Sequence, residues 1–318
     1  MKHSRRGGSQ TAGAVSRGPL WQALGILAEI LLTCAAVCAL YIVWQMWWTG
    51  VEAEQVQNET TQSVQWSDPG NGGGQVRIAQ AQQGDPPVQP EHPQEGDLIA
   101  QVYIPRFGSQ WHRNLVEGTD LTQLNRHGLG HYTNSKLPGQ VGNFAIAGHR
   151  NGYGQPLGDV DKLQEGDPII VRTKDYWYVY RYTRYEIVLP TETRVITDEP
   201  WIGSPQWPTE SAAGKRLITM TTCEPKYTTP THRWISYGEL AYWAKVSDGV
   251  PQELAATDGS GTVRFATTEN PSVASRIGSM RNVVVMALIV WAVLFIAAAI
   301  VWRWPLIKAI RSGERRRP

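Results

Sequence analysis

The sequence predicts a mainly β protein whose strands close, or partly close, into a barrel. Between residues 97 and 246, runs of β-branched and aromatic residues alternate with polar ones, as strands with one buried face do. Gly and Pro separate the runs and mark turns. Many strands with few helices are typical of a barrel, and about 150 residues suffice for one domain. The expected strands lie within 98–107, 142–148, 167–173, 175–189, 215–222 and 233–246.

One short helix is expected inside this domain, over Asp120–His127. Thr119 or Asp120 would cap its N-terminus, because a side-chain oxygen there accepts hydrogen bonds from free backbone N–H groups. Gly128 would end it, since glycine readily adopts the backbone conformation that follows a helix.

Two apolar runs flank the domain and predict transmembrane helices. Residues 283–302 carry no charge in 20 positions, enough for a helix of about 30 Å that spans a bilayer core. Residues 20–48 form a longer run, interrupted by Glu29, with tryptophans at its far end that are typical of a membrane interface. A cleaved signal peptide is the alternative for this first run, which however is too long and lacks a convincing small-residue cleavage site.

The charges at the two ends predict the topology. Residues 1–19 and 303–318 are basic, and positive charge stays on the cytoplasmic side of a membrane. Both tails are therefore expected in the cytoplasm, with everything between the spans outside. Within that outer part, the polar, Gly- and Pro-containing segments 49–96 and 247–282 are predicted to be a flexible stalk and a linker. The formal net charge of +2 gives no support to a nucleic-acid partner.

Cys223 is the only cysteine in the part expected outside the membrane. Cys34 and Cys38 fall in the first expected span, on one face of one helix, where packing is the simplest interpretation. In an oxidising compartment a structural cysteine normally has a disulfide partner. An unpaired thiol therefore indicates either an intermolecular bridge or a reactive group, and composition leaves both open.

The position of Cys223 favours a nucleophile. It ends an expected strand and precedes Glu224-Pro225, while Arg233 begins the next expected strand after a short loop. A guanidinium brought back beside the thiol could stabilise a thiolate and an oxyanion. Such a nucleophile also needs an imidazole that transfers protons. His149, directly after an expected apolar strand, is the best candidate for this imidazole. A structural role for His149 is the alternative. The histidines of the domain are His112, His127, His131, His149 and His232.

The segments NFAIAGHR (143–150) and ITMTTC (218–223), followed by Arg233, resemble the sortases of Gram-positive bacteria. The nucleophile motif of that family is T-L-x-T-C, and Met220 replaces its leucine, a change that conserves volume. The resemblance covers about residues 97–246. Within the family, TTCEPKY and AGHRNGYG are most similar to class E, the housekeeping class of high-GC actinobacteria.

The resemblance implies a closed barrel of about eight strands and a cysteine transpeptidase. Cys223 would cleave the Thr–Gly bond of a sorting signal similar to L-P-x-T-G or L-A-x-T-G, forming a thioacyl enzyme. His149 would transfer protons, and Arg233 would stabilise the oxyanion together with the backbone N–H of Glu224. An amine of a lipid-linked cell-wall precursor, or of a pilin, would accept the acyl group, without any metal or other cofactor. The residues expected to line the bound signal are Thr221, Thr222 and Glu224.

The segment 190–214 corresponds to the loop that reads the sorting signal in sortases. Its Trp201 and Trp207 have a second interpretation, as side chains that cover one end of the barrel. Tyr153, like other tyrosines of the domain, is assigned to packing.

Three alternatives to a sortase are weaker. An L,D-transpeptidase usually has a histidine two residues before its cysteine, where this chain has Thr221. A papain-like wall peptidase tends to have its cysteine at a helix start and its histidine downstream, whereas His149 lies upstream. A non-catalytic, sortase-like surface receptor would usually have lost a catalytic position, and Cys223, His149 and Arg233 are all present.

Overall fold

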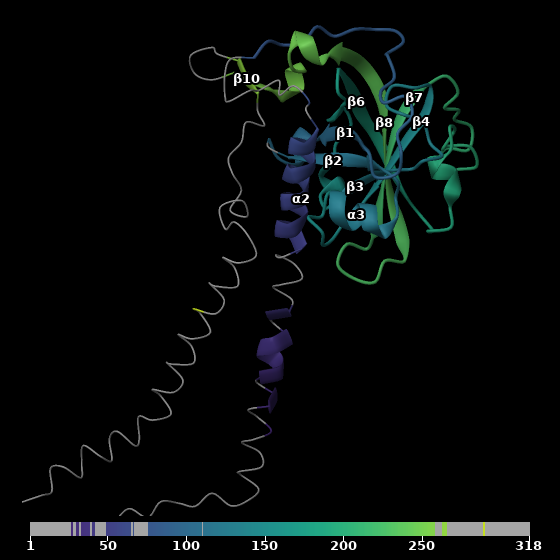
Figure 1. Ribbon diagram of the computed structural model, residues 1–318. Helices are drawn as coiled ribbons and strands as arrows, with labels where there is room; N and C mark the ends of the chain where they lie inside the picture. Colours follow the sequence, from purple (N-terminus) through teal and green to yellow (C-terminus); the bar gives the residue numbers. More distant parts are fainter. Residues whose placement is uncertain are drawn as a thin grey trace, which may run out of the picture. The chain divides into compact units, whose positions relative to one another are not determined.

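The computed structural model describes residues 49–64, 66, 76–109, 111–257 and 263–265, and residues 27, 30, 31, 33–38, 40, 41 and 289 of the apolar runs (Figure 1). Among these described residues, no helix is both long and apolar enough to cross a bilayer. The expected spans 20–48 and 283–302 lie almost wholly outside the described residues, as do both basic tails.

The chain forms two compact units, Met1–Trp48 and Thr49–Pro318. The second contains a closed barrel of eight strands in the order β1-β2-β3-β4-β7-β8-β6-β5, which confirms the predicted fold class (Figure 1). The pairs β2–β3 and β4–β7 are parallel, and the other neighbours are antiparallel. The strands are β1 (Leu98–Tyr103), β2 (His112–Glu117), β3 (Leu129–His131), β4 (Gly142–Gly148), β5 (Pro168–Arg172), β6 (Tyr176–Val188), β7 (Arg216–Glu224) and β8 (His232–Lys245).

Short helices connect the strands. α3 (Leu121–His127) begins as predicted, because the Asp120 side chain accepts a hydrogen bond from the backbone N–H of Gln123, and it ends at Gly128. The single-turn helices are η3 (Pro105–Phe107), η4 (Val160–Lys162), η5 (Thr193–Ile196), η6 (Val246–Asp248) and η7 (Gln252–Leu254).

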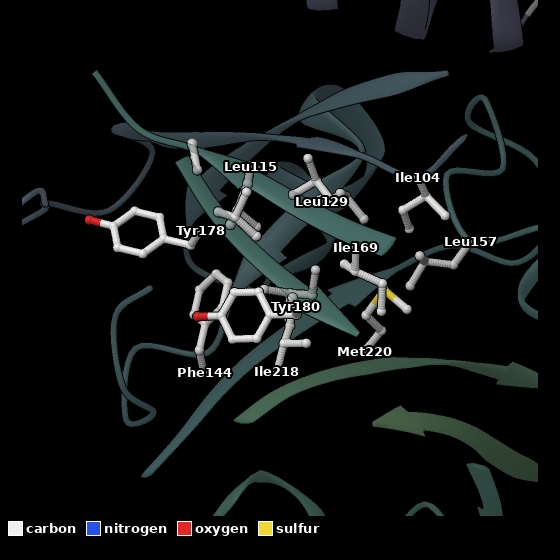
Figure 2. Packing of buried hydrophobic residues seen from close by; sticks show 14 of the residues in the cluster. Ile104, Leu115, Leu129, Phe144, Leu157, Ile169, Tyr178, Tyr180, Ile218 and Met220 are labelled. Atoms are coloured by element: carbon white, nitrogen blue, oxygen red, sulfur yellow. The ribbon is translucent and has the colours of Figure 1, made fainter. Parts of the chain in front are cut away.

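The barrel interior is filled by aliphatic and aromatic side chains from nearly every strand (Figure 2). Tyr178 and Tyr180 are fully buried there, yet their hydroxyls are satisfied. Tyr178 donates to the carbonyl of Pro87 at 2.6 Å, and Tyr180 accepts from the backbone N–H of Gly139 at 2.8 Å. Each ring therefore contributes apolar burial without an orphaned polar atom.

Helix α2 (Thr49–Ser63) corrects the expectation of a flexible stalk over 49–96. It docks on the barrel beside β2 and α3 through polar side chains (Figure 1). Gln57 accepts from the backbone N–H of Asn114 at 2.6 Å and, through its own carbonyl, from the Asn114 side chain at 2.8 Å. Thr61 donates to the same asparagine at 3.2 Å. The low apolar content of 49–96 predicted a disordered segment. In the structure, hydrogen bonds to the buried Asn114 hold helix α2 against the barrel.

Both ends of the expected 97–246 domain extend further than predicted. The backbone N–H of Ala79 donates to the carbonyl of Val250 at 2.8 Å, and Gln82 pairs with Trp243 at the end of β8. Within the segment expected to be a linker, β9 (Ala255–Thr257) and β10 (Val263–Phe265) form a two-stranded sheet. Apolar side chains from these segments form a second buried cluster outside the barrel wall.

Candidate active site

Cys223 and Arg233 face each other at one end of the barrel. β7 and β8 are antiparallel, and their register pairs Cys223 with Arg233. The guanidinium Nη1 donates to the Cys223 sulfur at 3.4 Å, and the thiol is half-buried and free of any disulfide. The planar guanidinium also has further N–H groups that could donate to an oxygen held beside the sulfur.

His149 lies on the neighbouring strand end. β4 runs parallel to β7, with Ala147 paired to Thr221. Continuing this register by two positions brings His149 level with Cys223, and adjacent strands are about 4.8 Å apart. The hydroxyl of Thr222 donates to the carbonyl of Gly148 at 2.7 Å, which ties the two strand ends together just before the histidine.

The imidazole of His149 contacts two side chains, one from another part of the chain and one from its own loop. Its Nε2 lies 2.7 Å from Oδ1 of Asn125, on α3, and its ring stacks on Tyr153 with centroids 5.0 Å apart. Burial lowers the pKa of His149 below the ordinary histidine value, because a partly buried imidazolium loses hydration. Sequence predicts only packing for Tyr153, and Asn125 carries no motif that points to a role beside His149.

Arg150 joins the two strand ends that carry His149 and Cys223. It forms an ion pair with Glu224 and donates to the carbonyl of Cys223 at 3.4 Å. Its guanidinium carbon lies 4.8 Å from the centroid of the Trp234 ring, and the residue is only 6% exposed. The Glu224 carboxylate is thus committed to this cation, and only its backbone is left for the role expected of it.

The two threonines before Cys223 point to opposite faces of β7, because side chains alternate along a strand. Thr221 shares the face of Cys223, and its hydroxyl lies 3.0 Å from that of Tyr132. Thr222 points the other way and is buried against Gly148. Of the pair, only Thr221 lies on the face where a peptide bound to Cys223 would run.

The other histidines of the barrel domain have different surroundings. His131 is buried with its Nδ1 2.8 Å from Glu117, and His112 stacks on Tyr103. His127 lies on α3, and His232 is exposed beside Thr231. Among the described residues, no group of three or more His, Cys, Asp or Glu side chains is arranged to hold a metal ion.

A buried ion pair fixes the segment 190–214 against the barrel. Arg194 donates to both carboxylate oxygens of Glu186, at 2.9 and 2.7 Å, and the Tyr237 hydroxyl donates to the same carboxylate at 2.6 Å. Trp201 is buried with its edge toward the Tyr237 ring, and Trp207 is partly buried in the same cluster. Both tryptophans therefore pack on the outer face of the barrel wall rather than on its end, where one of the two interpretations expected them.

A closed β-barrel with a thiol, a guanidinium and an imidazole on three adjacent strand ends defines a cysteine-dependent acyl-transfer enzyme. The family description "Sortase domain" matches residues 102–241. The sortase SrtE2 of Streptomyces coelicolor is 34% identical over 243 residues, 73% of this chain and 88% of that protein. SrtE1 of the same organism is 29% identical over 237 residues, 72% of this chain and 60% of that protein. The chain belongs to the sortase family and is a cysteine transpeptidase.

Solved sortase structures are also similar to the chain. The SrtA sortase from Actinomyces oris is 37% identical, and the match covers 55% of this chain and 96% of the chain of that structure, with a TM-score of 0.49. The sortase E from Streptomyces avermitilis is 37% identical, and the match covers 51% of this chain and 99% of the chain of that structure, with a TM-score of 0.45. The class E names of the Streptomyces coelicolor relatives agree with the class that TTCEPKY and AGHRNGYG indicate.

Proposed function

We propose that this chain is a membrane-anchored sortase that transfers proteins from a C-terminal sorting signal to an amine at the cell wall. The observation that carries the proposal is the hydrogen bond from Arg233 to the Cys223 sulfur, with His149 on the adjacent strand end. This arrangement supplies the thiolate, the oxyanion donor and the proton carrier that acyl transfer through a thioester needs.

In the first half of the reaction, the Cys223 thiolate attacks the carbonyl carbon of the threonine in a signal of the type LPxTG or LAxTG. Arg233 stabilises the oxyanion, assisted by the backbone N–H of Glu224. The C–N bond to glycine then breaks, and the imidazolium of His149 gives its proton to the departing amine. The threonine acyl group remains on sulfur as a thioester.

In the second half, an amine attacks the thioester. His149, now neutral, takes a proton from that amine as the new C–N bond forms, and the thiolate of Cys223 leaves. The product is an amide, so the protein is transferred rather than released to water. The acceptor amine belongs to a lipid-linked peptidoglycan precursor or to a pilin, and the acyl donors are surface proteins or pilins with a sorting signal.

The anchoring part of the proposal rests on sequence. Residues 20–48 and 283–302 would cross the membrane, with 1–19 and 303–318 in the cytoplasm and the barrel outside the cell. The barrel would then work on a tether at each end, beside the wall and the lipid-linked precursor.

The test uses the full chain, a fluorescent sorting-signal peptide and an oligoglycine amine. Cys223→Ala should abolish peptide transfer while the circular dichroism spectrum is unchanged. The double variant Cys34→Ala/Cys38→Ala, which removes the other two thiols, should retain transfer and serves as the matched control. Full activity of Cys223→Ala contradicts the proposed mechanism.

A further inference from the structure

An apolar surface lies on the last part of β6. In β6, Tyr185 and Ile187 alternate with the buried Glu186 and Val188 and therefore point to one side of the strand, and Leu189 follows directly after it. They are 48%, 44% and 59% exposed. Three large exposed apolar side chains close together on a soluble surface indicate a contact with something outside the domain.

The same surface continues onto β8. Ile187 pairs with Trp234 across the two strands, and the Trp234 ring stacks on Tyr185 with centroids 4.3 Å apart and planes 8° apart. We call Tyr185, Ile187, Leu189 and Trp234 the apolar ribbon. Arg150 also lies against the Trp234 ring, so the ribbon contacts a side chain of the active site.

The apolar ribbon lies at the active-site end of the barrel. Val188 pairs with Arg233, and Arg233 pairs in turn with Cys223. Because side chains alternate, Trp234 and Arg233 point to opposite faces of β8. The ribbon thus lies on the opposite face of these strands from Arg233 and Cys223, the face on which Trp234 packs against the barrel core.

The start of α2 lies at this end as well. A Cβ atom at Gly154, in the loop after His149, would lie 3.3 Å from the Cβ of Ala53 in the first part of α2. α2 begins at Thr49, directly after the expected span 20–48. Ala53 is thus only five residues from the end of that expected span in sequence.

The opposite end of β6 and β8 is covered by the chain itself. There Trp177 and Ala244 are buried under Val250 and Phe265, from the segments that follow the barrel. One exposed aliphatic residue at that end, Ile78, is 49% exposed and pairs with Val250. Its exposed fraction is similar to those of the ribbon residues. It lies near the far end of β8, whereas Cys223 pairs with Arg233 at the start of that strand.

We propose that the apolar ribbon rests in the headgroup region of the bilayer, so that the catalytic groove opens next to the lipid surface. The inference depends on the membrane anchoring in the proposed function. A bilayer is favoured over a soluble partner because α2 begins at this end of the barrel and follows the expected span in sequence, so an anchored chain would present the ribbon to lipid at a high effective concentration. Aromatic and aliphatic side chains that enter the interface suit such a contact.

The experiment places the photoreactive amino acid p-benzoylphenylalanine at single positions of the full chain, in nanodiscs of phosphatidylglycerol and phosphatidylcholine. Positions 187 and 189 test the ribbon, and position 78 is the matched control. Position 295, inside the second expected span, reports whether the chain is anchored. Mass spectrometry then identifies lipid adducts, which should be clearly more abundant at 187 and 189 than at 78.

The outcomes separate the two proposals. Lipid adducts at 295, 187 and 189 but not at 78 support the ribbon as a membrane contact. Adducts at 295 with none at 187 and 189, or with equal yields at 78, overturn the ribbon and leave the anchoring intact. Crosslinks from 187 or 189 to another copy of the chain also overturn it. No adduct at 295 contradicts the anchoring, and the inference fails with it.

Discussion

Arg150→Met probes how the two catalytic strand ends are held together. The arginine is almost fully buried between Glu224 and the Trp234 ring and donates to the carbonyl of Cys223. Methionine keeps an unbranched apolar stem in the same space but removes the charge and every hydrogen bond. The Glu224 carboxylate is then left without its cation.

The expected magnitude follows from the burial of the two partners. Breaking a fully buried ion pair by removing one partner costs about 3–5 kcal/mol of unfolding free energy. The Glu224 side chain is 25% exposed and can regain some water, which places Arg150→Met near the lower limit, at about 3 kcal/mol. Because a displacement of about 1 Å in a catalytic group can cost 100-fold in rate, kcat/KM should fall by about that factor.

The assay combines urea unfolding with kcat/KM for a sorting-signal peptide, both on the full chain. The double variant Arg150→Met/Glu224→Gln should recover part of the lost stability, because it removes the uncompensated carboxylate as well. Lys215→Met is the matched control, since Lys215 forms a half-exposed ion pair with Glu239 away from the site. It should cost less than about 1 kcal/mol and leave kcat/KM unchanged. Near-normal stability and rate in Arg150→Met contradict the reasoning.

Three further predictions concern other parts of the site. Arg233→Lys should lower kcat by about 100-fold or more, because one ammonium cannot reproduce the planar fork beside the sulfur; a rate close to that of the wild type contradicts the oxyanion role. Tyr153→Ala should expose the His149 imidazole and raise its lowered pKa toward the ordinary value, which moves the His149 limb of the kcat/KM–pH profile to higher pH. An active Tyr153→Ala variant in which the His149 limb of the pH profile is not shifted contradicts this effect of burial on the His149 pKa. Glu186→Gln should destabilise the fold by about 3 kcal/mol, because Arg194 keeps a buried charge, and should raise the KM of the peptide more than it lowers kcat. An unchanged free energy of unfolding and an unchanged KM in Glu186→Gln contradict the interpretation that this ion pair holds the segment 190–214 in place.

Strands with a clear period were predictable, whereas strands that depend on distant partners were not. β4 to β8 consist of apolar or alternating runs that the sequence shows directly. β3 has only three residues, and β2, with the sequence HRNLVE, contains two adjacent aliphatic residues and no alternation. Both become strands because β1 and β4 offer them backbone partners.

α2 and the segments around β9 show a related limit. Their composition resembles a linker, because few side chains could build a core. In the structure, Gln57 and Thr61 instead bond to the buried Asn114, a contact over more than 50 positions of sequence. Amino-acid composition predicts how much apolar surface a segment can bury. It does not predict that a polar segment will bind the barrel through hydrogen bonds.

The site divides in the same way. Arg233 beside Cys223 could be expected because a short loop joins two antiparallel strands. His149 beside Cys223 requires the parallel pairing of β4 with β7, which periodicity does not reveal and the family motif implied. The partners Asn125 and Arg150 are fixed only by tertiary structure, since the residues that they contact lie 24 and 73 positions away.

The most direct test of the central claim is to trap the acyl enzyme. The full chain is mixed with a sorting-signal peptide without any amine acceptor, quenched in acid, and measured by intact and peptide mass spectrometry. The mechanism predicts an adduct of the peptide up to its threonine, located on Cys223 and released by hydroxylamine. Peptide cleavage without an adduct on Cys223, or with the adduct on another residue, contradicts it.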